Sequence, residues 1–385
     1  MENLPDHLAM NELQVTSVKR VIVRGTNWVG DAMMTLPALR ELRRLFPDAH
    51  ITLATRPWAK GLFIGAEFVD QLQIHDGRGI GSFFRQVRAW RQGQFDLAIL
   101  LTNSFASALV AALAKIPVRI GYASDGRARL LTHAIELPEW RSTRHEIFYY
   151  LRIVAELEWL FTQQQTFLDV QPDASLEVSD LRKDEARYLL QRQGVYGEWP
   201  IIALCPGSIN SRAKRWPAER YAVLAVRCID TLGAQVLLIG SKEELEVSRQ
   251  VVDRMHNKPI VLTGQTDIAE AVAVLSVADL LITNDTGPAH IAAALGRPTL
   301  VIFGSTNPLT TRPFSPFAEI IRHPPDCAPC MLRDCPIDHR CMTAITPDEV
   351  FEHAREMLVK QNFAAESQRH RGLQDIPKST VEVNN

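Results

Sequence analysis

The 385-residue sequence has no apolar run close to the roughly 20 residues that a membrane-spanning helix needs. Its first 17 residues also lack the basic and apolar regions of a signal peptide. The chain also lacks a large excess of either charge: its formal net charge is −2, which argues against a general nucleic-acid partner. A hydrophobic content of 46% is typical of globular proteins. We therefore expect a cytoplasmic protein of two ordinary domains, with contact to a membrane surface left open.

Several cofactor motifs are missing too. The turn after the first predicted strand carries Gly25 and Gly30 five residues apart, which fits neither G-x-G-x-x-G nor the P-loop pattern. This absence weakens the interpretation as a nicotinamide oxidoreductase. The chain also has no Asp-x-Asp pair of the kind that holds a metal–diphosphate complex. If a sugar nucleotide binds, cations and backbone amides must stabilise its diphosphate.

Short apolar strands alternate with helices along most of the chain, which predicts doubly wound parallel sheets. The pattern occurs twice, so we expect an α/β protein with two Rossmann-like domains that face each other across a cleft. The expected divisions are a flexible leader, a first domain, a connection, a second domain and a flexible tail: 1–17, 18–175, 176–198, 199–362 and 363–385.

The stretch from Leu280 to Gly304 reads as a buried strand, a polar turn, an Ala-rich helix and a second buried strand. Thr286 and Gly287 would offer free amides at the helix N-terminus, where a phosphate can bind. Asp285 lies beside that anion site, so a sugar hydroxyl is its more natural partner. Capping of the helix by Asp285 is an equally good interpretation at this point.

A second carboxylate, Asp31, follows the first strand and begins a helix predicted over 32–46. In a cleft it could act as a general base toward a hydroxyl group. Helix capping, which is common and contributes about 0.5–1 kcal/mol, is the alternative.

Two further loops follow strands of the second domain. In the segment 205–217, Lys214 could neutralise a diphosphate, while Ser208 and Asn210 offer hydrogen bonds to it. Glu244, in the other loop, could accept hydrogen bonds from a ribose or base. The alternatives without a binding role are a solvated basic loop for the segment 205–217 and a charged helix start for the loop that contains Glu244.

Residues 19–60 contain eight Lys or Arg and only three acids. Arg40, Arg43 and Arg44 share one helix face by their spacing. Such a run is usually a solvated face; it could also bind an anionic acceptor or anionic lipid headgroups. The acceptor-binding candidates in this region are Arg40, Arg43, Arg44 and Arg56.

Two of the six cysteines, Cys205 and Cys228, lie in apolar surroundings and are expected to be reduced core residues. The other four fall within fifteen residues: Cys327, Cys330, Cys335 and Cys341. A structural metal, either zinc or an iron–sulfur cluster, and reduced thiols that pack a loop are equally weighted interpretations; redox pairing comes third. We expect this segment to lie away from the strand edge and to play no part in catalysis.

Together these motifs resemble the bacterial lipopolysaccharide heptosyltransferases of glycosyltransferase family 9, most closely the type II members. The resemblance covers roughly residues 19–360 and is strongest in four motifs: 24–31 with Thr35-Leu36-Pro37-Ala38-Leu39, Pro206-Gly207 with Ala213-Lys214-Arg215-Trp216-Pro217, Thr283-Asn284-Asp285-Thr286-Gly287 with His290, and the Cys-rich segment ending at Met342. It implies a GT-B fold and transfer of heptose from ADP-heptose, with inversion, to the heptosylated inner core of lipopolysaccharide. It implies no catalytic cofactor, a lipid A–Kdo–heptose acceptor, peripheral contact with the inner membrane, and no nucleic-acid partner.

The resemblance also implies roles for individual residues. Asp31 would be the general base, Lys214 would contact the donor's phosphate and heptose, and Asp285 would bind heptose hydroxyls. The diphosphate would be held by Thr286, Gly287 and His290. One departure from the family pattern, the loop Gly207-Ser208-Ile209-Asn210, puts that loop's side-chain contacts in doubt. The alternatives are another GT-B glycosyltransferase, a nucleotide-sugar epimerase, or a non-catalytic nucleotide-sugar or metal-binding protein.

Overall fold

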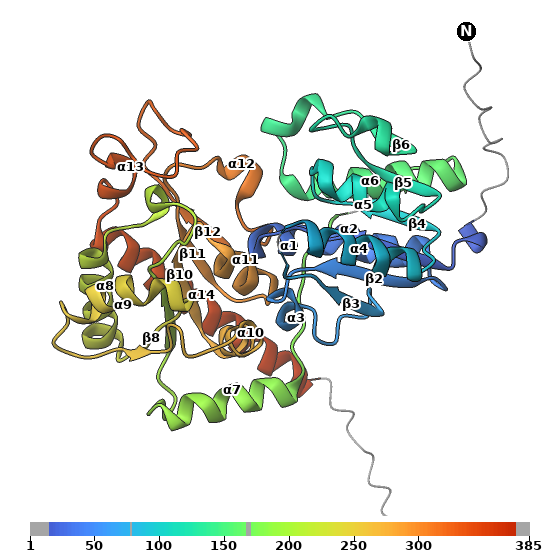
Figure 1. Cartoon of the computed structure of the whole chain (residues 1–385). Helices are drawn as coiled ribbons and strands as arrows, with labels where there is room; N and C mark the ends of the chain where they lie inside the picture. The colour runs from blue at the N-terminus through green and yellow to red at the C-terminus, as the bar shows by residue number, and fades with distance from the viewer. Residues whose placement is uncertain (1–14, 78, 167–170, 375–385) are drawn as a thin grey trace, which may run out of the picture.

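The computed structural model describes residues 15–77, 79–166 and 171–374, with 362–374 as backbone only. The N-terminal half is built on a parallel sheet of six strands in the order β3-β2-β1-β4-β5-β6 (Figure 1). The bounds of its strands are β1 (Arg20–Arg24), β2 (His50–Thr55), β3 (Gln71–Ile74), β4 (Leu97–Leu100), β5 (Val118–Tyr122) and β6 (His133–Ile135).

The C-terminal half repeats this topology. Its parallel sheet has the order β12-β11-β10-β7-β8-β9, which is the same 3-2-1-4-5-6 arrangement of strands. Its strands are β7 (Ile201–Cys205), β8 (Gln235–Leu238), β9 (Ile260–Val261), β10 (Leu280–Asn284), β11 (Thr299–Ile302) and β12 (Ala318–Ile321). The predicted fold class, two Rossmann-like doubly wound sheets, is confirmed.

Helices cover both faces of each sheet. The N-terminal half contains α1 (Val29–Met34), α2 (Leu36–Leu45), α3 (Ala59–Leu62), α4 (Ile80–Gln92), α5 (Phe105–Leu113) and α6 (Glu146–Thr162). The rest are α7 (Asp180–Arg192), α8 (Ala218–Leu232), α9 (Leu245–Val252), α10 (Ile268–Val277), α11 (Gly287–Ala294), α12 (Pro308–Thr311), α13 (Arg340–Thr343) and α14 (Pro347–Gln374). Among the described residues, no helix combines the length and the apolar character that crossing a bilayer requires.

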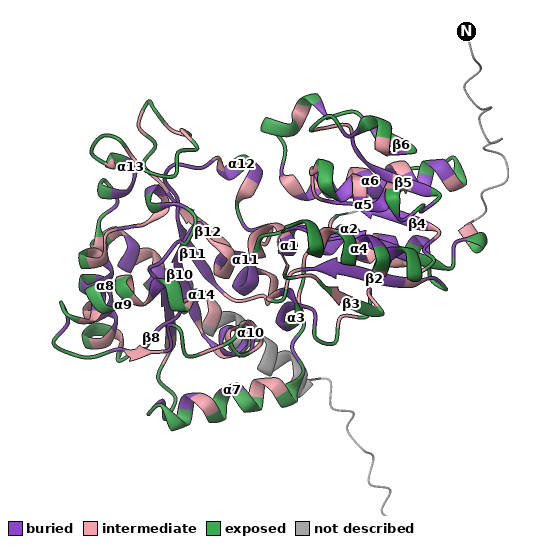
Figure 2. Cartoon of the chain, in the orientation of Figure 1, coloured by how far each residue is buried: buried purple, intermediate pink, exposed green. Residues whose placement is uncertain are grey.

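The strand β4 illustrates why both faces are covered. Leu97 and Ile99 belong to the core under α2 and α6, whereas Ala98 and Leu100 belong to a separate core under α4 and α5. Because side chains alternate along a strand, an apolar run of this kind needs helices on both sides. Most strands are accordingly buried, and exposed residues lie on the outer helices (Figure 2).

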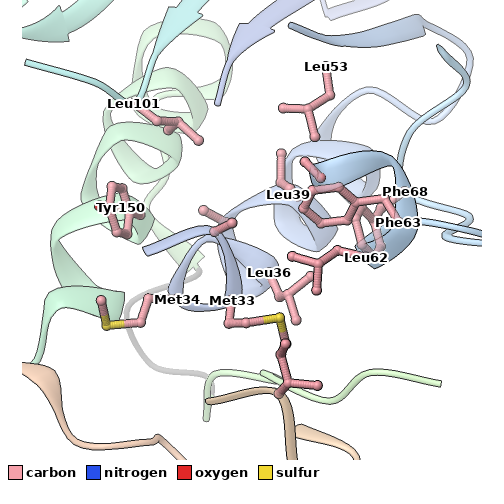
Figure 3. Packing of buried hydrophobic residues seen from close by; sticks show 14 of the residues in the cluster. Met33, Met34, Leu36, Leu39, Leu53, Leu62, Phe63, Phe68, Leu101 and Tyr150 are labelled. Carbon is pink, nitrogen blue, oxygen red and sulfur yellow. The ribbon is translucent and has the colours of Figure 1, made fainter. Parts of the chain in front are cut away.

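The core under α2 reaches the site described below. Figure 3 shows part of it, with Phe63 and Phe68 packed edge to face at 6.1 Å between ring centroids. Met34, Leu101 and Tyr150 belong to the same core and also line the cavity between the two halves. The cavity wall is therefore held by rigid packing.

Some predicted boundaries differ from the structure. The single helix expected over 32–46 is divided at Thr35, because Pro37 lies in the first turn of α2 and cannot donate the amide that a continuous helix requires. The short β6 was not predicted. Helix α14 continues past the expected tail boundary at 363, while 375–385 and most of the leader 1–17 lie outside the described residues.

The two halves meet through helices that begin at strand ends. Helix α1 packs on α11, where a Cβ on Gly287 would lie 2.8 Å from the Cβ of Val29. A Cβ on Gly30 would lie 3.2 Å from a ring carbon of His290. The glycines thus permit the close approach, which brings the carboxyl ends of β1 and β10 toward each other.

Candidate active site

A cavity of about 870 Å³ lies between the two halves. Its N-terminal wall comes from the β1–α1 turn, the β4–α5 loop, the 3₁₀ turn Glu139–Ser142 and the start of α6. Its C-terminal wall comes from the segment with α12 after β11 (Asn307, Thr310 and Thr311) and from the loop after β12 (Pro329 and Met331). A cleft at strand carboxyl ends is the usual ligand site of open α/β sheets.

Asp31 lines this cavity from the first turn of α1. The N-cap of α1 is Trp28, so Asp31 does not cap this helix, but its position in the first turn agrees with the other part of that interpretation, stabilisation of the helix dipole. Burial raises the pKa of Asp31 to about 6, and the positive charge of Lys214 in the C-terminal half opposes that rise. A carboxylate with a pKa near 6 is ionised at neutral pH and is a stronger base than an exposed one.

This pKa predicts an acid limb in the pH profile of activity. As the pH falls through about 6, Asp31 takes up a proton and can no longer accept one, so kcat/KM should drop about tenfold per pH unit below that value. The measurement is kcat/KM for the acceptor between pH 5 and 8. A profile that stays flat down to about pH 5 would contradict a base role for Asp31.

Lys214, at the end of a 3₁₀ turn (Arg212–Lys214), makes the central ion pair of the C-terminal half. Its Nζ lies 2.7 Å from Oδ2 of Asp285 and 3.3 Å from the Asp285 carbonyl oxygen. The hydroxyl of Thr306 donates to the same Oδ2 at 2.6 Å. Asp285 is buried and precedes the N-cap of α11, Thr286, so it does not cap that helix. Lys214 is therefore paired with Asp285 and is also close enough to Asp31 to oppose the rise that burial causes in the pKa of that carboxylate.

Asn284, which the sequence analysis did not select, connects the end of β10 to the loop after β7 through hydrogen bonds. Its side chain is fully buried, and its Nδ2 donates to the carbonyls of Pro206 at 2.9 Å and Gly207 at 3.0 Å. Its Oδ1 accepts from the backbone N–H of Trp216 at 3.0 Å. These bonds fix the loop after β7 against the end of β10, as the shared sheet edge predicts.

The predicted anion site at the start of α11 stays a prediction, and the geometry there agrees with it. Thr286 and Gly287 are partly exposed at the helix N-terminus, where unpaired amides can meet a phosphate. His290 lies one turn further on and is buried; burial lowers its pKa to about 4. His290 is thus neutral at physiological pH and can offer a hydrogen bond but no charge.

The remaining candidates for binding the sugar donor lie at the same sheet edge and differ in burial and hydrogen bonding. Ser208 is buried, and its carbonyl accepts two hydrogen bonds from Arg215, whereas Asn210 is exposed. Glu244 is buried and caps its own turn by accepting from the backbone N–H of Ser241 at 2.8 Å. A Cβ on Gly207 would lie 2.1 Å from Oε1 of Glu244, so a larger residue there would require the carboxylate to move. Donor-binding roles for these residues stay predictions.

A polar network that the sequence analysis missed forms the N-terminal wall. The Arg141 guanidinium lies 4.4 Å from the ring centroid of Tyr149 and donates to its hydroxyl at 3.0 Å. Asn103 donates to that hydroxyl at 2.7 Å. Glu146 lies 3.8 Å from Arg141, and burial, opposed by Arg141, raises its pKa. The only sequence signal was a concentration of charged residues just before the start of α6.

The four predicted acceptor-binding arginines are absent from the described lining of the cavity. Arg40 pairs with Asp173 at 3.3 Å, Arg43 with Asp70 at 2.5 Å, and Arg44 with Glu41 at 2.8 Å. Arg56 lies nearest, with its Nε 3.4 Å from the side-chain oxygen of Asn27, which does line the cavity. The acceptor-binding role of these four residues stays untested.

The Cys-rich segment packs against the loops after β7 and β11, so the expectation that it lies away from the strand edge is wrong. The backbone N–H of Met331 donates to Ser305, that of Ala213 donates to Arg333, and Pro329 and Met331 line the cavity. Cys205 and Cys228 are buried, as expected for core residues.

The metal hypothesis has a direct geometric test. In the described part of the chain, no three His, Cys, Asp or Glu side chains are placed to hold a metal ion, so this arrangement of the four thiols does not fit a metal. Burial and the neighbouring thiols of Cys330, Cys335 and Cys327 raise the pKa of Cys341. The thiols are close enough to interact, and no step below depends on a metal there.

The comparisons with known proteins agree with this architecture. A family model described as glycosyltransferase family 9 (heptosyltransferase) matches residues 83–340. Lipopolysaccharide heptosyltransferase 2 of Escherichia coli is 30% identical over 362 residues, covering 89% of this chain and 99% of the relative. Lipooligosaccharide heptosyltransferase 2 of Haemophilus influenzae is 30% identical over 360 residues, with 88% and 99% covered. The solved structure of E. coli ADP-heptose lipopolysaccharide heptosyltransferase II matches with a TM-score of 0.76 at 27% identity, covering 89% of this chain and 99% of that one. The chain is therefore a glycosyltransferase and belongs to family 9, the heptosyltransferases.

Proposed function

We propose that this enzyme transfers heptose from ADP-heptose to the heptosylated inner core of lipopolysaccharide, with inversion at the anomeric carbon. One observation carries the proposal. Asp31 lines the cavity on the N-terminal half, and the rise that burial causes in its pKa is opposed by the positive charge of Lys214, which is paired with Asp285 on the C-terminal half. A base and a cation that come from different halves of the chain and interact electrostatically suit a single displacement. The names of the relatives, heptosyltransferase 2, support the choice of donor and acceptor.

In the proposed reaction, a hydroxyl of the acceptor heptose gives its proton to the Asp31 carboxylate. The hydroxyl oxygen forms a bond to C1 of the donor heptose as the bond between C1 and the diphosphate oxygen breaks. ADP leaves with the bonding electrons. Because attack and departure occur on opposite faces of C1, the configuration at C1 is inverted.

The donor side supplies charge stabilisation for the departing diphosphate. Lys214 and the N-terminal amides of α11 at Thr286 and Gly287 provide positive charge and hydrogen-bond donors at fixed positions. Asp285, held by Lys214 and Thr306, would accept hydrogen bonds from heptose hydroxyls. Since these groups already provide the stabilisation, we propose that transfer is metal-independent, and activity that persists in excess chelator is the expected result.

On the acceptor side we propose Arg141 as the cation that meets the anionic inner core. Replacing it with glutamine should raise the acceptor KM about 10- to 100-fold, because a hydrogen bond to a charged group is lost, and should leave the donor KM unchanged. The matched control is Arg144→Gln. The guanidinium carbon of Arg144 lies 3.9 Å from the ring centroid of Phe148, and Arg144 lies outside the described lining of the cavity. Equal acceptor KM values for the Arg141 variant and wild type would remove Arg141 from the acceptor site.

The proposed function is tested by the release of ADP from ADP-heptose with and without a mono-heptosylated core. We expect release only when the acceptor is present. Release without any acceptor would favour a hydrolase, conversion of ADP-heptose into an epimer without release would favour an epimerase, and binding of the donor with neither change would favour a non-catalytic protein. The lipid nature of the acceptor also leads us to propose peripheral contact with the cytoplasmic side of the inner membrane.

A further inference from the structure

The outer helix layer of the N-terminal sheet is formed by α4 and α5, which pack against each other. Their inward sides bury Val87, Trp90, Ala108 and Ala111 on the sheet. The opposite face of the sheet carries α1 and α3, which contact α11 and α10 of the C-terminal half. The outward side of α4 and α5 thus belongs to the helix layer on the sheet face opposite to α1 and α3.

The charge on α4 is of one sign. The segment 77–95 contains no acidic residue, and α4 exposes Arg85, Arg88 and Arg91. Within the described residues none of these three arginines forms an ion pair, and Arg91 donates only to the backbone oxygen of Leu113. The arginines of α2 differ in this respect, since Arg40 and Arg43 are paired with carboxylates.

Large apolar side chains lie beside these cations. Ile80 and Phe84, one turn apart on α4, are 77% and 59% exposed, and Phe105 at the start of α5 is 47% exposed. Exposing aromatic and aliphatic side chains is unfavourable in water, while the spacing of Ile80, Phe84 and Arg88 places them along one stripe. Apolar residues that can enter the acyl boundary, next to arginines that can bind phosphates, form the pattern of a helix that lies on a membrane.

This layer also adjoins the cavity. Ser104, the residue before Phe105, lines the cavity, and so does Trp28, which is 52% exposed. A lipid-anchored sugar could therefore reach Asp31 from a membrane surface that touches α4 and the start of α5.

We propose that this surface, the α4–α5 face (Ile80, Phe84, Arg85, Arg88, Arg91 and Phe105), docks on anionic phospholipid. The partner follows from charge complementarity, since cations without carboxylate partners attract anionic headgroups, and from the apolar side chains between them. The inference rests on the proposed function for its biological sense, because a lipid-linked acceptor requires a membrane nearby. It moves the expected lipid contact from the α2 arginines, which are paired within the protein, to α4.

Flotation of the full-length protein with vesicles tests this assignment directly. Wild type should bind vesicles that contain phosphatidylglycerol and bind pure phosphatidylcholine vesicles much more weakly. The variant Arg85→Glu/Arg88→Glu should bind the anionic vesicles at least about tenfold more weakly, and Phe84→Ser should weaken binding while preserving its salt dependence. The matched control is Arg249→Glu/Arg254→Glu, two exposed arginines of the other half, in or next to α9, which should bind as wild type does.

Activity on a short acceptor without lipid separates this inference from the proposed function. The α4 variant should transfer to that acceptor at the wild-type rate, which also shows that it is folded. Wild type that fails to bind anionic vesicles, or an α4 variant that binds as tightly as wild type, overturns the docking assignment even if transfer is normal. An α4 variant that loses transfer to the lipid-free acceptor while remaining folded would assign this face to sugar binding and overturn it as well.

Discussion

Replacing Asp31 with asparagine should lower the rate of transfer by about 10²–10⁴-fold, the range expected when a positioned general base is lost. Asparagine keeps the size of the side chain at the cavity wall and removes its negative charge together with the ability to take up a proton. Binding of ADP-heptose should be unchanged, because Asp31 lies on the half opposite Lys214 and Asp285. The measurements are single-turnover transfer and calorimetric titration with the donor.

The same variant should gain stability at pH 8. The pKa of Asp31 is raised to about 6 in the folded protein, so between its ordinary value of 3.8 and about 6 the folded state binds more protons than the unfolded state. Stability is therefore lost as the pH rises through that window, and the ionised carboxylate destabilises the fold above it. Neutral asparagine should be about 1–2 kcal/mol more stable at pH 8 in urea unfolding. A variant that is inactive and less stable would indicate a structural role for Asp31.

The Lys214→Met variant should lose both donor binding and stability. We expect kcat/KM to fall about 10²–10³-fold, as when one electrostatic donor is removed from a transition-state site. Among the described residues, Thr306 would be the one remaining side-chain partner of the buried Asp285 carboxylate. The free energy of unfolding should therefore drop by about 2–3 kcal/mol, somewhat less than for a fully buried pair because Lys214 is partly exposed.

A change in the pH profile identifies Lys214 as a neighbour of Asp31. Removing the positive charge should raise the pKa of Asp31 further, so the acid limb of the residual activity should move to higher pH. The matched control is Arg212→Met in the same 3₁₀ turn; Arg212 is exposed and pairs with Asp334 at the surface. If both variants behave alike, the loss comes from disturbing the turn and not from the missing charge.

The architecture and the shared edge of the loops after β7 and β10 could be predicted because their signals are local. Thr283-Asn284-Asp285-Thr286-Gly287 joins a strand to a helix within a few residues, and parallel strands bring their carboxyl ends to one edge. Lys214 was therefore expected near Asp285, and the structure places them 2.7 Å apart. Chemistry that depends on one strand–turn–helix unit can be recognised without knowing the rest of the fold.

The acceptor wall could not be predicted in this way. Arg141, Asn307 and Pro329 come from distant segments that converge only through packing of the two halves. Sequence spacing also cannot distinguish a paired cation from an unpaired one: Arg43 and Arg88 look alike in the sequence, but only Arg43 has an aspartate 2.5 Å away. The misplacement of the Cys-rich segment has the same origin, since its contacts with Ser305 and Ala213 are tertiary.

Transfer of heptose to a mono-heptosylated core can be measured directly from the mass of the product. The purified chain is incubated with ADP-heptose and two acceptors, a mono-heptosylated lipopolysaccharide core and a core that lacks heptose, and each core is analysed by mass spectrometry. We expect the mono-heptosylated core to gain one heptose, with one ADP released per heptose added, and the heptose-free core to gain none. Addition to the heptose-free core alone, or no addition to either core by a protein that binds ADP-heptose, would contradict the proposed function.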